Sequence, residues 1–157
     1  GKGTAFNIFL PRYTAEVEKI EQVDPEVPTN GSAETILLVE DEPANLKMAK
    51  RMLRRLGYTV LLAGTPGEAI RIAKEHPGKV RLLMTDVVMP EMNGRDLAEN
   101  ILALNPDIKI LFMSGYTADV IAHHGVLDEE VHFIQKPFSM QDLASKLQEM
   151  LGESEIE

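Results

Sequence analysis

Short apolar runs alternate with amphipathic stretches from Thr35 to the end of the chain, and this alternation predicts the fold. The apolar runs are hydrophobic at successive positions, which is typical of strands buried on both faces of a parallel sheet. They predict strands at residues 35–39, 58–62, 81–85, 108–113 and 131–135. The amphipathic stretches predict helices at residues 43–56, 66–76, 94–104, 117–124 and 139–151.

Residues that stop helices follow three of these helical patterns. Gly57, Pro77–Gly78 and Asn105–Pro106 stand where the periodicity ends. A chain in which strands and helices alternate in this way is predicted to be a doubly wound α/β fold, with helices on both faces of a parallel sheet. In such a fold the functional site lies at the carboxyl ends of the strands.

Polar residues follow four of the five predicted strands. Glu40 and Asp41 come after the first strand, Asp86 after the third, Ser114 after the fourth and Lys136 after the fifth. Carboxylates that repel one another at one edge of a sheet suggest a divalent cation, and a hard cation such as Mg²⁺ suits ligands that are all oxygen. Carboxylates, Mg²⁺, a lysine and a hydroxyl together make a site for a phosphoryl group.

Composition and charge exclude several classes of function. The chain has no cysteine, which excludes disulfides, zinc-thiolate sites and thiol chemistry. The net charge of −9 lies mostly outside the predicted fold, because residues 14–34 hold six acids and one base and residues 153–157 hold three acids. No basic patch indicates nucleic-acid binding. No apolar run approaches the roughly 18 residues that span a bilayer, so a cytoplasmic module is expected.

The residues at the strand ends resemble those of a two-component receiver domain, the phosphoacceptor module of response regulators. LLVEDE, TDVVMPEMNG, FMSGYT and IQKPF occur in the order of that family, over residues 35–151. The resemblance implies a five-stranded parallel sheet of order 2-1-3-4-5, the flavodoxin-like three-layer receiver fold. In that order the first and third strands are neighbours, so the acids that follow them meet.

The resemblance also implies a role for each residue of the site. Asp86 is the expected phosphoacceptor, a nucleophile that forms an acyl phosphate, and Ser114 and Lys136 are its catalytic partners. The expected metal ligands are Glu40, Asp41, Asp86 and the main-chain carbonyl of Val88. Many receivers have aspartate where Glu40 stands, so whether Glu40 binds Mg²⁺ directly or through water is left open. Pro90 and Gly94 are expected to give a stiff, tightly turned loop that holds Asp86 at the edge of the sheet.

Further residues are candidates for switching and for contact with a partner. Ser114 and Phe133 are the expected switch residues, although Phe133 is also compatible with a core position. The Lys136–Pro137 bond resembles the cis peptide of the family. Asn45, Met48 and Met52 are expected to form a ridge that docks on a partner's helices, and the alternative for the methionines is a wide core stripe.

The first thirteen residues, GKGTAFNIFLPRY, carry a second resemblance. Gly-x-Gly-Thr followed by alternating Phe6, Ile8 and Leu10 is similar to the last glycine box and final strand of a histidine-kinase ATPase domain. The alternative is an unrelated edge strand. The expected organisation is therefore a terminal kinase strand at 1–13, an acidic linker at 14–34, a receiver at 35–152 and a tail at 153–157.

Together these features predict the carboxy-terminal receiver of a hybrid sensor histidine kinase. It is expected to take a phosphoryl group from phosphohistidine onto Asp86 with Mg²⁺. The donor is either the kinase's dimerisation helices or a phosphotransfer protein. The piece alone is expected to phosphorylate and dephosphorylate itself, whereas the parent chain is a histidine kinase that is either cytoplasmic or membrane-anchored. No nucleic acid or direct membrane contact is expected, and a weak homodimer is allowed.

The ends of the chain and two alternatives complete the prediction. A start at Gly1 and an end just past the last helix suggest a piece of a longer protein with no output domain after it. One alternative is a stand-alone single-domain response regulator. The other is an aspartyl-phosphate phosphohydrolase, which usually has a second acid two residues after the nucleophile, where this chain has Val88.

Overall fold

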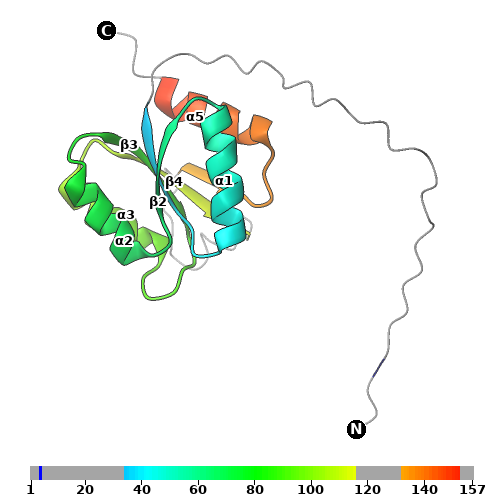
Figure 1. Cartoon of the computed structure of the whole chain (residues 1–157), viewed down its shortest axis with the longest axis horizontal. Helices are drawn as coiled ribbons and strands as arrows, with labels where there is room; N and C mark the ends of the chain where they lie inside the picture. The colour runs from blue at the N-terminus through cyan, green and yellow to red at the C-terminus, as the bar shows by residue number, and fades with distance from the viewer. Residues whose placement is uncertain (1–3, 5–33, 116–131, 153–157) are drawn as a thin grey trace.

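A five-stranded parallel sheet lies between two layers of helices (Figure 1). The computed structural model describes residue 4, residues 34–115 and residues 132–152. The helix predicted at 117–124 lies outside these residues. The strands are β1 (Thr35–Val39), β2 (Thr59–Ala63), β3 (Val80–Asp86), β4 (Lys109–Ser114) and β5 (His132–Gln135). The helices are α1 (Pro43–Arg55), α2 (Pro66–Glu75), α3 (Gly94–Leu104) and α5 (Met140–Leu151).

The strand order is β2-β1-β3-β4-β5, which confirms the predicted topology. From β1 the chain passes outward to β2 and then returns across β1 to β3. The order therefore reverses between β1 and β3, whose last paired residues are Val39 and Thr85. Glu40 and Asp86 follow these two residues directly, so the topology alone places their backbones side by side.

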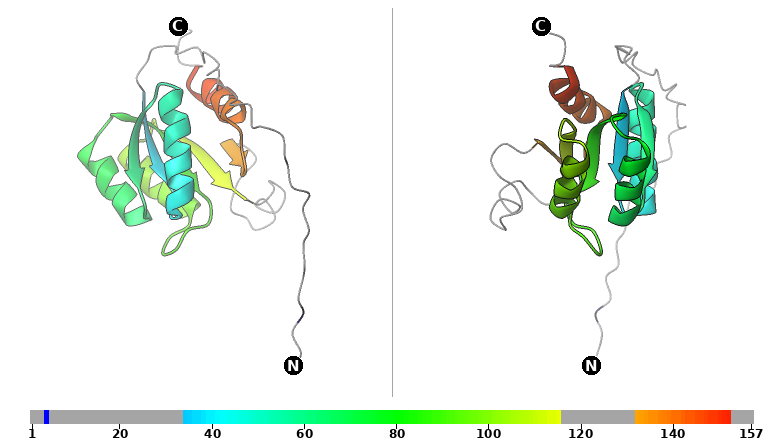
Figure 2. Two further views of the ribbon diagram at one scale, coloured as in Figure 1. Left: turned by 45° about the vertical axis from the view of Figure 1, so that its right-hand side comes forward. Right: turned by 90° about the vertical axis from the view of Figure 1, so that its left-hand side faces the viewer.

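Two hydrophobic clusters, one on each face of the sheet, hold the layers together. In β1, Ile36 and Leu38 belong to the cluster under α1 and α5, whereas Leu37 and Val39 belong to the cluster under α2 and α3. All four side chains are fully buried, because successive residues of a strand point to opposite faces. The inner strands are thus buried on both sides, as their continuous hydrophobicity predicts, and Figure 2 shows the same layers from two further directions.

Several helix and strand boundaries differ from the prediction by one residue. Tyr58 was predicted to begin β2, but its N–H donates to the carbonyl of Leu53 at 3.1 Å and so belongs to the turn that ends α1. Gly57 precedes it with a φ of 91°, in the left-handed region that glycine adopts without a steric cost. The strand therefore begins only at Thr59.

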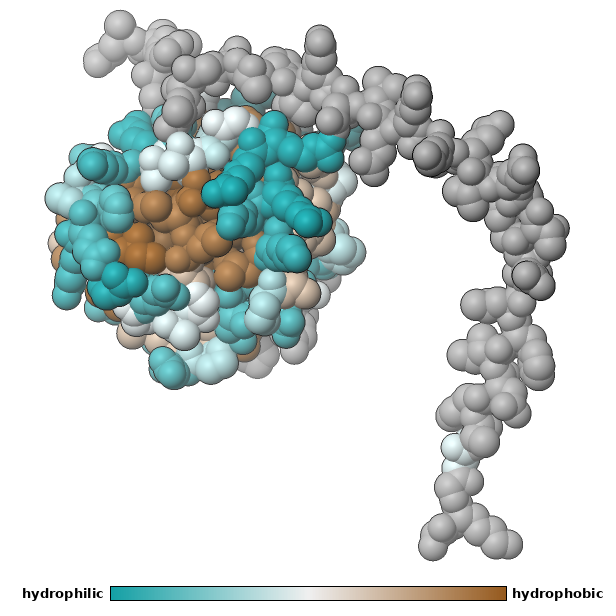
Figure 3. Space-filling view, viewed as in Figure 1, coloured by the Kyte–Doolittle hydropathy of each residue, from teal (hydrophilic) through white to brown (hydrophobic). Residues whose placement is uncertain are grey.

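The edge strand β2 is less buried than the inner strands. Val60, Leu61 and Leu62 are all partly exposed, and Figure 3 shows apolar side chains gathered over β2 between α1 and α2. Burial on both faces therefore holds for the inner strands but not for this edge of the sheet. Within the described part of the chain, no helix has the length and apolar character needed to cross a membrane.

Candidate functional site

Three acids meet at the carboxyl edge of the sheet. Glu40 follows β1, Asp41 begins the short loop before α1, and Asp86 is the last residue of β3. Each offers a carboxylate oxygen, and these oxygens lie within 4.8 Å of one another. Glu40 is buried, Asp86 is half-buried and Asp41 is exposed. The predicted acids are thus brought together, at different depths in the protein.

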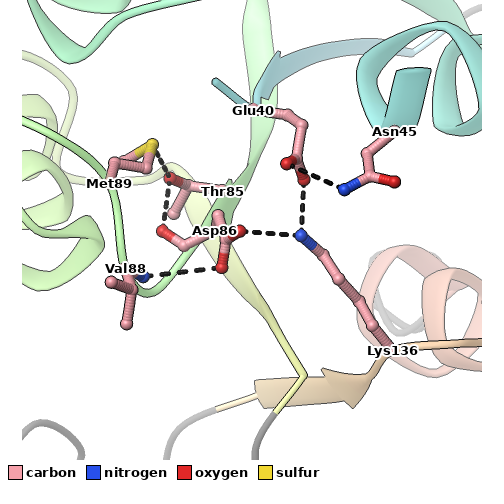
Figure 4. Close-up of polar contacts among 7 residues, drawn as sticks. All are labelled: Glu40, Asn45, Thr85, Asp86, Val88, Met89 and Lys136. Atoms are coloured by element: carbon pink, nitrogen blue, oxygen red, sulfur yellow. Dashed lines mark hydrogen bonds and ion pairs between the residues drawn. The ribbon is translucent and has the colours of Figure 1, made fainter. Parts of the chain in front are cut away.

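Lys136 bridges two of these acids. Its Nζ donates to Oε2 of Glu40 at 2.5 Å and to Oδ2 of Asp86 at 2.7 Å (Figure 4). Lys136 directly follows β5, and its main-chain N–H donates to the carbonyl of Ser114 at 2.7 Å. This bond keeps the ends of β4 and β5 together. The Lys136–Pro137 peptide bond is cis, as the resemblance implied.

The two carboxylates keep Lys136 positively charged. Burial acts to lower the pKa of Lys136, but the hydrogen bonds and negative charges of Asp86 and Glu40 outweigh it. The pKa of Lys136 therefore lies above its ordinary value. At neutral pH the site holds an ammonium between two carboxylates, which reduces the repulsion between them.

Glu40 has a hydrogen-bond donor for each of its carboxylate oxygens. Nδ2 of Asn45, in the first turn of α1, lies 3.3 Å from Oε1, and Lys136 occupies Oε2. Only 2% of the surface of Glu40 is exposed, and a buried carboxylate is costly unless it is paired and hydrogen-bonded. Asn45 and Lys136 together meet that requirement.

Thr85 is a site residue that sequence reasoning missed. It is fully buried next to Asp86, and its Oγ1 donates to the main-chain carbonyl of Asp86 at 3.0 Å. The same hydroxyl faces Sδ of Met89 at 3.9 Å, so it links the strand end to the following loop. The sequence marks Thr85 only as a single polar residue between the apolar part of the strand and Asp86.

The loop between β3 and α3 is held against the backbone of Asp86. A Cβ on Gly94 would lie 2.2 Å from the carbonyl oxygen of Asp86, so only glycine allows this approach. Its N–H donates to the carbonyl of Val87 at 2.9 Å. Gly94 was predicted to serve a tight turn, but the left-handed residue in this loop is Glu91, with a φ of 70°. The physical reason for Gly94 is close packing of the backbones.

The donor set fits a hard divalent cation. Glu40, Asp41 and Asp86 are all oxygen ligands, of the kind Mg²⁺ prefers. Among the ion pairs of residues 34–115 and 132–152, Lys136 contacts Glu40 and Asp86 but not Asp41. Val88, whose carbonyl was the fourth predicted ligand, is 63% exposed, and its N–H lies 3.4 Å from Oδ1 of Asp86. Its backbone is therefore beside the acids.

The predicted switch and docking residues occupy different environments. Ser114 is buried at the end of β4, and Phe133 of β5 is half-buried against the cluster under α2 and α3. Met48 is 43% exposed on α1, whereas Met52 packs partly against the cluster under α1 and α5. Met52 is partly exposed and also contacts the core, so its position is compatible both with a docking ridge and with a wide core stripe.

The fold is a doubly wound α/β domain with an acidic site at the carboxyl edge of its sheet, and comparison with known families identifies it. The profile of the response regulator receiver domain matches residues 36–148. The chain belongs to this family, the receiver domains of two-component systems.

Individual relatives extend this finding. The chain is 42% identical over 159 residues to the sensor kinase CckA of Brucella abortus, an alignment that covers 96% of this chain and 17% of that kinase. It is 33% identical to the response regulator receiver protein CpdR of the same organism, over 74% of this chain and 95% of that protein. The chain therefore spans about a sixth of the length of the kinase it matches.

Solved structures agree with the fold. The receiver domain of the hybrid histidine kinase CckA superposes with a TM-score of 0.64 at 35% identity, covering 74% of this chain and 98% of that one. The receiver domain of the sensor histidine kinase PA1611 from Pseudomonas aeruginosa superposes with a TM-score of 0.67 at 26% identity, over 77% and 99% of the two chains. That structure carries a magnesium ion in its active-site cleft.

Proposed function

We propose that this domain accepts a phosphoryl group from a phosphohistidine onto Asp86. The observation that carries the proposal is the position of Asp86 at the strand edge, with Oδ2 2.7 Å from the ammonium of Lys136 and two further acids beside it. A carboxylate held at the surface of a rigid sheet is a nucleophile in a fixed position. The ammonium next to it compensates negative charge that an incoming phosphoryl group brings.

The transfer exchanges one bond to phosphorus for another. A carboxylate oxygen of Asp86 bonds to phosphorus, the phosphorus–nitrogen bond of the donor breaks, and its electron pair stays on the imidazole nitrogen. Lys136 remains protonated because its pKa is raised, so it can pair with the phosphoryl oxygens. The hydroxyl of Ser114, at the end of the neighbouring strand, is the second group of this chain assigned to those oxygens.

Mg²⁺ is the metal that the donor set fits. Glu40, Asp41, Asp86 and the carbonyl of Val88 are the residues that would hold it, and the metal would supply positive charge beside the phosphoryl oxygens. Glu40 is already bonded to Lys136 and Asn45, which favours contact with the metal through water. Phe133 is partly buried on β5. Together with Ser114, it is assigned to the conformational switch that follows phosphorylation.

The partner is a histidine-containing phosphodonor domain. Asn45, Met48 and Met52 on α1 are assigned to the docking ridge, and the exposed side chain of Met48 supports this assignment. The phosphoryl group would then leave by hydrolysis or by transfer to another histidine.

The parent protein is proposed to be a hybrid histidine kinase. The alignment with the sensor kinase CckA covers 96% of this chain and so extends beyond the receiver into the preceding segment. This supports a kinase ATPase strand at residues 1–13, a linker at 14–34, the receiver at 35–152 and a tail at 153–157. The match to CpdR over 95% of its length keeps a stand-alone response regulator as the alternative. The sequence of the gene upstream of residue 1 distinguishes the two.

Incubation with acetyl phosphate and Mg²⁺, followed by intact-mass measurement, tests the chemistry. One phosphoryl adduct is expected per chain, dependent on Mg²⁺ and abolished by Asp86→Asn. An adduct that persists in the Asp86→Asn variant, or that forms equally well in chelator, would disprove the assignment of Asp86 as the acceptor.

A further inference from the structure

Asn45 connects helix α1 to the buried acid of the site. It is half-buried, and its Nδ2 lies 3.3 Å from Oε1 of Glu40 (Figure 4). An ionised carboxylate only accepts hydrogen bonds, so the amide nitrogen of Asn45, and not its oxygen, must face Glu40. The contact therefore has a defined direction, from the helix to the acid.

Glu40 in turn accepts a hydrogen bond from Lys136. A glutamate has one more rotatable bond than an aspartate, so a single contact leaves its carboxylate free to turn. Here Oε1 is held by Asn45 while Oε2 accepts from Lys136 at 2.5 Å. The same ammonium reaches Oδ2 of Asp86 at 2.7 Å. Four side chains thus form one continuous chain of hydrogen bonds, which runs from α1 through Glu40 and Lys136 to Asp86.

We propose that Asn45 is a positioning residue of the phosphorylation site. It fixes the carboxylate of Glu40, and through Glu40 it holds the ammonium of Lys136 where it also reaches Asp86. This proposal rests on the proposed function of Asp86, and it gives Asn45 a task inside the site in addition to any contact with a partner. Groups that orient metal ligands and catalytic side chains commonly change metal affinity or activity by about 10- to 100-fold when removed.

The positioning role and a docking role make different predictions. A residue that only contacts the phosphodonor protein affects transfer from that protein and nothing else. A residue that positions Glu40 and Lys136 also affects Mg²⁺ binding and phosphorylation by acetyl phosphate, because neither process needs a docked protein. Acetyl phosphate therefore separates the two roles.

The test uses the full chain with Asn45→Ala, which removes the donor, and Asn45→Gln, which keeps an amide on a longer side chain. Mg²⁺ affinity is measured by calorimetric titration, and the rate of adduct formation with acetyl phosphate by intact mass. Asn45→Ala is expected to weaken Mg²⁺ binding about tenfold and to slow adduct formation even at saturating Mg²⁺. Asn45→Gln is expected to recover part of both. Ala44→Ser, at the neighbouring exposed position of the same turn, is the matched control and should change neither.

Unchanged Mg²⁺ affinity and an unchanged acetyl phosphate rate in a folded Asn45→Ala protein would overturn the proposal. If that variant does not fold, the unaltered protein still decides the question through the side-chain amide signals of Asn45 in a nitrogen–proton spectrum. These signals are expected to shift when Mg²⁺ is added and in the Glu40→Gln variant, and signals that respond to neither would also overturn it. Failure of the unaltered protein to form an adduct would instead refute the role of Asp86, while the Mg²⁺ titration would still report on Asn45.

Discussion

Nζ of Lys136 lies 2.7 Å from Oδ2 of Asp86, although the two residues are 50 positions apart in the chain. Asp86 ends β3 and Lys136 follows β5, with β4 between these strands in the sheet. The contact therefore exists only when all three strands are paired. It also supplies positive charge to two carboxylates that would otherwise repel each other, so the stability of the site and the chemistry proposed for it involve the same ammonium.

The first prediction concerns this ammonium. Lys136→Met keeps much of the side chain's shape but leaves Glu40, which is 2% exposed, without its charged partner. The loss of one partner of a largely buried ion pair predicts a decrease of about 2–4 kcal/mol in the free energy of unfolding. Urea unfolding without divalent cations measures it. Added Mg²⁺ should restore part of the loss, because a ligand that binds only the native state stabilises it.

The matched control for Lys136 is Lys146 on α5. Lys146 pairs with Glu149 at 3.0 Å, but the side chain of Glu149 is 55% exposed. Exposed pairs contribute little, so Lys146→Met should change the free energy of unfolding by less than about 1 kcal/mol. Equal losses in the two variants would show that Lys136 has no special role in neutralising the acids.

The second prediction concerns Asp41. This exposed acid lies beside Glu40 and Asp86, and Lys136 does not contact it. Asp41→Ala should weaken Mg²⁺ binding strongly, because a hard cation loses a charged ligand. Without metal it should raise the free energy of unfolding by up to about 1 kcal/mol, the repulsion between two unit charges 4 Å apart in water. Calorimetric titration and urea unfolding measure the two effects. Asp107→Ala, which removes an exposed acid away from the site, is the control and should leave Mg²⁺ affinity unchanged. Unchanged Mg²⁺ affinity in Asp41→Ala would instead show that the metal binds elsewhere.

The third prediction tests the close approach at Gly94. A Cβ there would lie 2.2 Å from the carbonyl oxygen of Asp86 and 3.2 Å from Cα of Val87, so backbone must move. Overpacking of this kind predicts that Gly94→Ala lowers the free energy of unfolding by about 1–3 kcal/mol and slows phosphorylation of the displaced Asp86. Gly67→Ala, where the new Cβ meets nothing within 4 Å in helix α2, should instead stabilise by about 0.5–1 kcal/mol. Gly94→Ala with wild-type stability would show that the loop has room to adjust.

The sequence predicts the fold well because the signals are local and repeated. Each inner strand is a continuous apolar run, and Leu82, Leu83 and Met84 are fully buried as that pattern requires. Edges are harder to predict, since β2 carries an equally apolar sequence yet lies half-exposed at the side of the sheet. Neighbours in the sheet, not the strand's own residues, set its burial.

The residues of the site could be predicted, but not the contacts among them. Glu40, Asp86 and Lys136 were found because polar residues at strand ends converge in this topology. The bonds from Asn45 to Glu40 and from Thr85 to the carbonyl of Asp86 depend on rotamers and on the distance from α1 to the sheet. The pattern of apolar and polar residues contains no information on rotamers or on this distance. The sequence therefore predicted only a surface role for Asn45 and no role for Thr85.

The fourth prediction concerns the start of α5. Oγ of Ser139 accepts from the N–H of Asp142 at 3.1 Å, and the carboxylate of Asp142 accepts from the N–H of Ser139 at 2.9 Å. Ser139→Ala removes the cap and should cost about 1 kcal/mol at neutral pH by urea unfolding. Ser145→Ala, at an exposed position inside the same helix, should cost nothing, because alanine favours helix.

The same cap predicts a pH dependence. Hydrogen bonds from the main chain and then the hydroxyl of Ser139 hold the pKa of Asp142 below its ordinary value of 3.8. A depressed acid pKa contributes stability that is present above pH 3.8 and lost as the pH falls through the lower pKa of the folded state. The stability difference between wild type and Ser139→Ala should therefore narrow below pH 3.8 without vanishing, since Oγ still accepts from the N–H of Asp142. A difference that is constant with pH would show that the hydroxyl of Ser139 takes no part in lowering the pKa of Asp142, since the main-chain N–H of residue 139 still donates to that carboxylate in Ser139→Ala.

The fifth prediction concerns the boundary of the receiver. Both hydrophobic clusters are built from residues at and beyond Ile36 in the described chain. Glu34 remains when residues 1–33 are deleted. Its main-chain carbonyl accepts from the N–H of Thr59 at 3.0 Å, and its carboxylate pairs with Arg81 at 3.7 Å. The deletion should therefore change the free energy of unfolding by no more than about 1 kcal/mol in urea. A longer deletion, through Val39, also removes β1. This strand pairs with β2 and β3 and has four fully buried residues, so the longer deletion should abolish folding. A loss of several kcal/mol from the shorter deletion would mean that residues before Glu34 pack on the receiver as part of its structure, and the division into a kinase strand, a linker and a separate receiver would be wrong.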